Sequence, residues 1–118
     1  MPTIHTRMLW EILLPATLKG AHINLSQHHL WVQFAVNLTK GVTVYRPATG
    51  SWKDCAVNRE TSTVKEQMIP VRIYATLEDM KKIVEFTIIH YKQDAIFWYV
   101  VSEDVQITTA GELGIHYA

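Results

Sequence analysis

Four short apolar runs, separated by two stretches with helical spacing, constrain the fold of this chain more than any other feature of its sequence. The strand candidates are residues 8–16, 42–46, 71–75 and 95–101. The first is largely apolar, as expected for a strand covered on both faces. Helices are predicted at about 26–40 and 77–91, which gives the order β-α-β-β-α-β.

Capping and periodicity support both helices. In the first, Ser26 is a candidate N-cap, and Lys40 and Gly41 would close the helix. In the second, the Thr76 hydroxyl stands three residues ahead of Asp79, a relative of the capping box. The apolar positions expected to face inward are Leu30, Trp31, Phe34, Ala35 and Leu38 in the first helix, and Met80, Ile83, Val84 and Ile88 in the second.

This order is the split βαβ pattern of a ferredoxin-like fold. We therefore predict an α+β sandwich, with an antiparallel sheet and two helices on one face. Right-handed crossovers place the first and third strands at the centre of the sheet and the second and fourth at its edges. A length of 118 residues fits one domain, residues 1–118.

Composition excludes several classes of protein. Eleven basic residues balance eleven acidic ones, so the basic excess of a nucleic-acid binder is missing. The single cysteine, Cys55, cannot form an intrachain disulfide and fits a reducing compartment. The apolar run from Met8 to Leu14 carries Glu11 and is too short for a secretory signal, and no stretch is long enough to span a membrane. We expect a cytoplasmic protein with no membrane and no nucleic-acid partner.

The last apolar run, AIFWYVV at residues 95–101, poses a problem at a sheet edge. It is apolar on both faces, and a free edge of this kind invites aggregation. A partner chain would cover it, so we predict a homo-oligomer. Alternatively, the C-terminal segment covers the edge within one chain, with residues 105–108 as a short fifth strand.

The stretch between the second and third strands is the candidate for function. About fifteen mostly polar residues follow Pro47, and Pro70 is expected to delay the third strand because proline cannot donate to a central ladder. Such long loops are often functional, although this one could equally be a hairpin whose Trp52 caps the edge of the core. The aromatic and acidic residues that stand out are Tyr45, Trp52, Asp54, Glu60, Glu66 and Glu103.

These residue types suit a cationic ligand rather than a metal. An indole face attracts a positive centre, and carboxylates hold ammonium groups. Glu66 precedes the third strand and Glu103 follows the fourth, where side chains leave the sheet, so both could equally be solvated charges. The six histidines show no metal spacing, and no glycine-rich phosphate loop or nucleophile motif occurs.

Several segments resemble the small phage enzymes that degrade S-adenosylmethionine (SAM), the SAM lyases formerly called SAM hydrolases. The segments INLSQHH, GVTVY, TGSWKD, Glu66 with VRIYA, and HYKQDAIFWYVV fall in the same order. A bacterial family of uncharacterised ferredoxin-like domains shares a similar Gly-x-Trp pattern. The resemblance implies a homotrimer with sites at subunit interfaces.

The resemblance also implies a chemistry and its residues. In the lyases, the carboxylate of SAM attacks its own γ-carbon and expels methylthioadenosine, leaving homoserine lactone, with SAM as substrate and no cofactor. Glu66 falls at the position of the family's site glutamate, and Glu103 resembles a second family acid. Trp52 occupies the position of the family's tyrosine and offers a cation–π face but no hydroxyl.

Three hypotheses follow from the sequence. The first is a SAM lyase at a trimer interface, with Glu66 and Trp52 as catalytic residues and with Glu103, Tyr45 and Asp54 binding the substrate. The second is a non-catalytic oligomer that sequesters a nucleotide or adenosyl ligand. The third is a structural oligomer without a ligand site.

Overall fold

The computed structural model describes residues 3–18, 21–39, 41–53 and 63–110. Its elements in chain order are β1 (Thr3–Pro15), β2 (Thr17–Leu18), β3 (Ala21–His22), α1 (Leu25–Thr39), β4 (Val42–Val44), β5 (Ala48–Lys53), β6 (Thr63–Ala75), α2 (Leu77–Tyr91) and β7 (Trp98–Thr109). The main sheet is antiparallel in the order β4-β6-β1-β7, and β5 continues beside β6 beyond β4. The short strands β2 and β3 pair only with each other within the described part of the chain.

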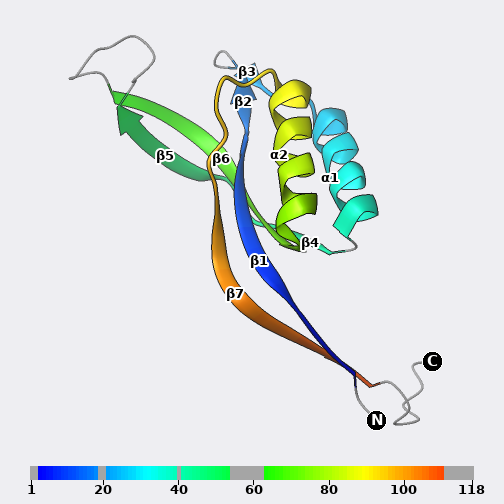
Figure 1. Cartoon of the computed structure of the whole chain (residues 1–118). Helices are drawn as coiled ribbons and strands as arrows, with labels where there is room; N and C mark the ends of the chain where they lie inside the picture. Colours follow the sequence, from blue (N-terminus) through cyan, green and yellow to red (C-terminus); the bar gives the residue numbers. More distant parts are fainter. Residues whose placement is uncertain (1–2, 19–20, 40, 54–62, 111–118) are drawn as a thin grey trace.

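The predicted α+β, ferredoxin-like architecture is confirmed. The first and third predicted strands, β1 and β6, are central, while β7 and the β4/β5 pair form the two edges. Both helices cover the same face of the sheet (Figure 1). The core lies between the helices and this face and contains Trp10, Ile12, Leu14, Trp31, Ala35, Val71, Ile73, Ala75, Met80, Ile83 and Tyr91.

The second helix forms as its sequence predicts. Thr76 is the N-cap, and its hydroxyl accepts a hydrogen bond from the Asp79 N–H at 3.2 Å. Met80 and Ile83 are fully buried, as expected from the apolar spacing. Lys92 ends the helix in the left-handed region at φ 53°, where its N–H reaches the last turn.

The first helix differs from its prediction at both ends. Asn24, not Ser26, caps it, because the Asn24 Oδ1 atom accepts a hydrogen bond from the Ser26 N–H at 3.0 Å. The helix ends at Thr39, and the predicted last-turn cation Lys40 lies outside the described residues. Trp31 is fully buried, but Leu30 is 56% exposed and does not face the core.

The two helices are joined by specific contacts as well as by apolar packing. The Trp31 Nε1–H donates to the Thr87 Oγ1 atom at 2.8 Å, and both residues are fully buried. The rings of Phe34 and Phe86 stack with centroids 3.9 Å apart. These pairs align α1 and α2 antiparallel across their contact.

Of the two alternatives predicted for the stretch after Pro47, a long loop or a hairpin, the described residues show the hairpin, which forms an arm. β5 pairs with the first part of β6, from Ala48↔Met68 to Lys53↔Thr63. Pro70 was also expected to precede the third strand, yet it lies inside β6. The Pro70 carbonyl accepts a hydrogen bond from the Tyr45 N–H at 2.9 Å. Because the N and C=O of one strand residue point to the same side, the Pro70 nitrogen also faces the break between β4 and β5. Pro70 therefore lies where the neighbouring strand changes from β4 to β5, an interrupted edge at which proline is tolerated.

The fourth predicted strand is longer than expected. β7 begins at Trp98 and continues to Thr109, so the predicted fifth strand at 105–108 is part of it. The register with β1 shifts between Leu9 and Trp10 and again between Arg7 and Leu9. Within the described residues, the C-terminal part of the chain therefore extends β7 along β1 and leaves the outer edge of β7 uncovered.

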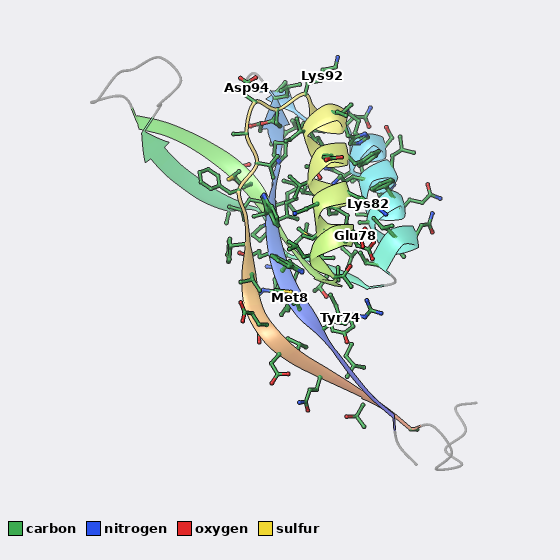
Figure 2. The ribbon with its side chains drawn as sticks, in the orientation of Figure 1. Met8, Tyr74, Glu78, Lys82, Lys92 and Asp94 are labelled. Carbon is green, nitrogen blue, oxygen red and sulfur yellow. The ribbon has the colours of Figure 1, made fainter. Side chains whose placement is uncertain are left out.

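Two strand pairs extend beyond the helices as arms (Figure 1). β6 stops at Ala75, opposite Met8, and the earlier part of β1 pairs only with β7 among the described strands. Figure 2 shows Met8 and Tyr74 at this point. The hairpin of β5 and β6 extends at the opposite end of the sheet. With these arms the radius of gyration is 17.3 Å, against about 13 Å for a compact chain of this length.

Candidate functional site

A row of four side chains crosses the sheet on the face that the helices leave uncovered. Glu11 of β1 stands in register with Arg72 of β6 on one side and with Tyr99 of β7 on the other. The Arg72 Nε–H donates to Glu11 Oε1 at 3.2 Å, and the Tyr99 hydroxyl donates to Glu11 Oε2. The Arg72 guanidinium lies 5.6 Å from the centre of the Tyr45 ring. We call Tyr99, Glu11, Arg72 and Tyr45 the open-face row.

Burial decreases from the middle of the open-face row toward its ends. Glu11 is only 9% exposed, whereas the Arg72 side chain is 39% exposed. Tyr45 and Tyr99 are 46% and 49% exposed. A carboxylate this buried requires charged or hydrogen-bonding partners, and Arg72 and Tyr99 supply them to both of its oxygens.

The sequence patterns did not indicate Glu11, Arg72 or Tyr99 as site residues. The available signal was Glu11 itself, a single carboxylate inside an otherwise apolar strand. β1 was expected to be covered on both faces, but the helices cover only one face. The positions between the core residues, Leu9 and Leu13, are therefore only half-buried. Glu11 shares this second face, where it can be paired without entering the core.

Two of the predicted site residues occupy the β5–β6 arm. Position 66 is in register with Gly50, and position 52 is in register with Val64. Trp52 and Glu66 are therefore diagonal neighbours on one face of the arm, with Cα atoms about 7–8 Å apart. Counting by twos along β6 from Arg72 places position 66 on the same sheet face as the open-face row. Asp54 and Glu60 lie outside the described residues.

The other predicted site residues lie elsewhere on the sheet. Tyr45 directly follows β4 and contacts Arg72, as described. Glu103 is exposed on β7, next to Ser102, which is in register with Leu9. Leu9 is in turn in register with Tyr74. Glu103 therefore belongs to the half of the sheet that carries the β1–β7 arm.

One protomer does not bring Glu66 and Glu103 together. Glu103 is adjacent to Ser102, which lies across the sheet from Tyr74 through Leu9. Tyr74 is eight residues beyond Glu66 on β6. At about 3.3 Å per residue this separation is about 26 Å along the strand, before two further strand spacings are crossed. The two arms also extend at opposite ends of the sheet (Figure 1).

Two histidines, His28 and His90, contribute to the contact between the helices. His28 Nδ1 lies 2.7 Å from the Tyr91 hydroxyl oxygen, and His90 Nε2 donates to the Gln27 carbonyl at 2.7 Å. Burial, followed by the charges of His90 and then His29, lowers the pKa of His28, and burial raises the pKa of Tyr91. No group of three potential metal ligands occurs in the described part of the chain. In the same part, no helix is both long and apolar enough to cross a bilayer.

Comparison with known proteins yields structural neighbours only. No protein-family model and no curated protein sequence matches the chain. The CutA1 structure from Oryza sativa is similar with a TM-score of 0.60 and 9% identity, covering 92% of this chain and 84% of the other. The CutA protein from Archaeoglobus fulgidus, a periplasmic divalent cation tolerance protein, has a TM-score of 0.57 and 9% identity, covering 86% and 83%.

A phage SAM lyase in complex with S-methyl-5'-thioadenosine is also similar. Its TM-score is 0.55 at 11% identity, with 89% of this chain and 92% of the other covered. At these identities, the likeness establishes a shared fold. The chain is therefore an α+β protein with the ferredoxin-like architecture common to these neighbours.

Proposed function

We propose that this chain forms a homo-oligomer that binds SAM between subunits and degrades it as a lyase. The observation that carries the proposal is the separation of Glu66 and Glu103 within one protomer. Two acids implicated in one site can meet only if a neighbouring subunit contributes one of them. The phage SAM lyase with bound methylthioadenosine shares the fold over most of both chains, which supports this choice of ligand.

The outer edge of β7 supports the oligomer. β7 pairs only with β1 among the described strands, and Tyr99 and Val101 on it are exposed. An uncovered apolar edge of this length can pair with another chain, and in a closed oligomer a neighbouring subunit covers it. We propose a trimer, in line with the resemblance to the lyases. Light scattering at micromolar concentration tests this assembly, and a monomer there would refute it.

The proposed reaction requires positioning more than covalent help. The SAM carboxylate oxygen attacks the γ-carbon, a new C–O bond closes the lactone ring, and the C–S bond breaks with its electron pair moving to sulfur. The products are neutral methylthioadenosine and homoserine lactone, which retains the ammonium group. Holding the ligand in a near-attack conformation is the main catalytic demand. In this proposal, Trp52 offers a ring face to the sulfonium, and Glu66 accepts hydrogen bonds from the ammonium.

A second function, adenosyl-ligand binding without turnover, is favoured by one specific residue. Trp52 stands where the resemblance to the lyases places a tyrosine, and indole lacks the phenolic hydroxyl. The two functions share one site and differ in whether the C–S bond breaks. Incubation of the purified protein with SAM, followed by chromatography for methylthioadenosine, separates them.

Substitutions at the two positions test the site itself. Glu66→Gln removes a charge-assisted hydrogen bond worth about 1.5–3 kcal/mol, so turnover or affinity should fall about ten- to hundredfold. Trp52→Tyr restores the family hydroxyl and should raise methylthioadenosine formation. Glu78→Gln is the matched control, because Glu78 is exposed on α2 and away from the sheet face (Figure 2). A wild-type protein that neither binds nor cleaves SAM would refute the proposed function.

A further inference from the structure

We propose that Arg72 binds the carboxylate of the ligand's amino-acid end, with Glu11 and Tyr45 as the residues that position it. The inference rests on the proposed function and adds a subsite to it. It assigns the carboxylate to one subunit's open-face row, while Glu66 of the neighbouring subunit's β5–β6 arm takes the ammonium.

The contacts of Arg72 hold its guanidinium in a defined orientation. Nε, the inner nitrogen, donates to Glu11 Oε1 at 3.2 Å, and the guanidinium packs over the Tyr45 ring at 5.6 Å. In the part of the chain that the structure describes, the terminal nitrogens of Arg72 make no hydrogen bond. The guanidinium fork can therefore present its outer N–H groups to a carboxylate, the geometry in which arginine binds most strongly.

The ionic pair is poorly explained by stability alone. A partly buried ion pair loses much of its Coulomb attraction to desolvation, and apolar residues of similar size often stabilise a fold as well or better. Glu11 nevertheless lies in the centre of the sheet at 9% exposure, flanked on its strand by Leu9 and Leu13. A buried carboxylate that fixes an accessible guanidinium is what a binding site for an anionic group requires.

The location of Arg72 agrees with a site shared between subunits. Through Glu11, Arg72 is level with Tyr99 on β7, and Glu103 follows four residues later on the same strand. Arg72 and Glu66 are six residues apart on β6, a separation of about 20 Å. The carboxylate and ammonium of an amino acid are adjacent, so Arg72 and Glu66 of one protomer are too distant for both to bind them. Arg72 of one subunit with Glu66 of the next removes this conflict.

Two ligands that differ in their amino-acid end provide the test. S-adenosylhomocysteine carries the carboxylate and cannot undergo the lyase reaction, whereas methylthioadenosine lacks the whole amino-acid moiety. Titration calorimetry should show that Arg72→Gln weakens S-adenosylhomocysteine binding about ten- to hundredfold, the loss expected for a charge-assisted bond, and changes methylthioadenosine binding less than twofold. Glu11→Gln, which keeps the side-chain shape, should cause a smaller loss that is also confined to S-adenosylhomocysteine.

Each outcome decides between the alternatives. Equal losses for both ligands, or no loss for either, would mean that the open-face row only stabilises the sheet, and the inference would be wrong. If Arg72→Gln does not fold, as judged by circular dichroism, Arg72→Lys keeps the charge and should show the same selective loss in weaker form. A wild-type protein that binds neither ligand would refute the proposed function itself, a result distinct from wild-type binding that Arg72 does not influence.

Discussion

A mixture of two inactive variants tests the shared site most directly. The register puts Glu66 and Glu103 about 26 Å apart along the strand direction of one protomer, so a site containing both must draw them from two subunits. Glu66→Gln and Glu103→Gln alone should each reduce methylthioadenosine formation about ten- to hundredfold.

Mixed oligomers should recover part of this activity. In a random one-to-one mixture, an interface is intact when one subunit supplies native Glu66 and its neighbour supplies native Glu103. Each condition is met half the time, so about a quarter of interfaces are fully native in a ring with one site per interface. Methylthioadenosine formation should rise to about a quarter of the wild-type rate in the unfractionated mixture, and to about a third in trimers from which tandem purification has removed the unmixed rings.

The assay uses co-expressed variants carrying different affinity tags, with tandem purification and native mass spectrometry to demonstrate mixed oligomers. The control mixes Glu66→Gln with the double variant that carries both substitutions, which leaves no native Glu66 anywhere and should restore nothing. Mixed oligomers that stay as inactive as the single variants would show that no site is shared in this way.

Three further predictions concern the fold and its assembly. Thr87→Val keeps the side-chain shape but leaves the buried Trp31 indole N–H without its acceptor, so urea denaturation should show a loss of about 1–3 kcal/mol; a loss below about 0.5 kcal/mol would contradict this account. Burial lowers the pKa of His28 below its usual 6.5, so the unfolded chain takes up this proton first and the free energy of unfolding should fall as the pH drops below about 6.5. Urea unfolding at several pH values checks this dependence, which His28→Gln should weaken. His22→Gln, at an exposed position on β3 whose charge does not act on His28, should leave it unchanged. Val101→Lys places a charge beside the open β7 edge and should dissociate the oligomer in native mass spectrometry; an oligomer that persists would assign the interface elsewhere.

The site was only partly predictable from sequence, for reasons that particular residues make clear. Tyr45 was selected as an aromatic beside a strand, and it does lie on the uncovered sheet face. Arg72 and Tyr99 could not be predicted as site residues, because each reaches Glu11 only through the register of its strand with β1. Register depends on contacts between segments some sixty and ninety residues apart in the sequence, and no local pattern carries that information.

The sequence alone determined the class of the fold and the order of its two helices and four main strands. Strand alternation, helical spacing and the Thr76 cap are local signals, and they do not depend on contacts with distant segments of the chain. Tertiary structure decided the rest. Pro70 lies inside a strand because the neighbouring edge changes from β4 to β5 beside it, and the predicted loop became an arm because β6 offered β5 a partner. Backbone N–H and C=O groups gain hydrogen bonds from any strand that lies beside them. Pairing between distant segments therefore overrides the local preference for loop or strand at these positions.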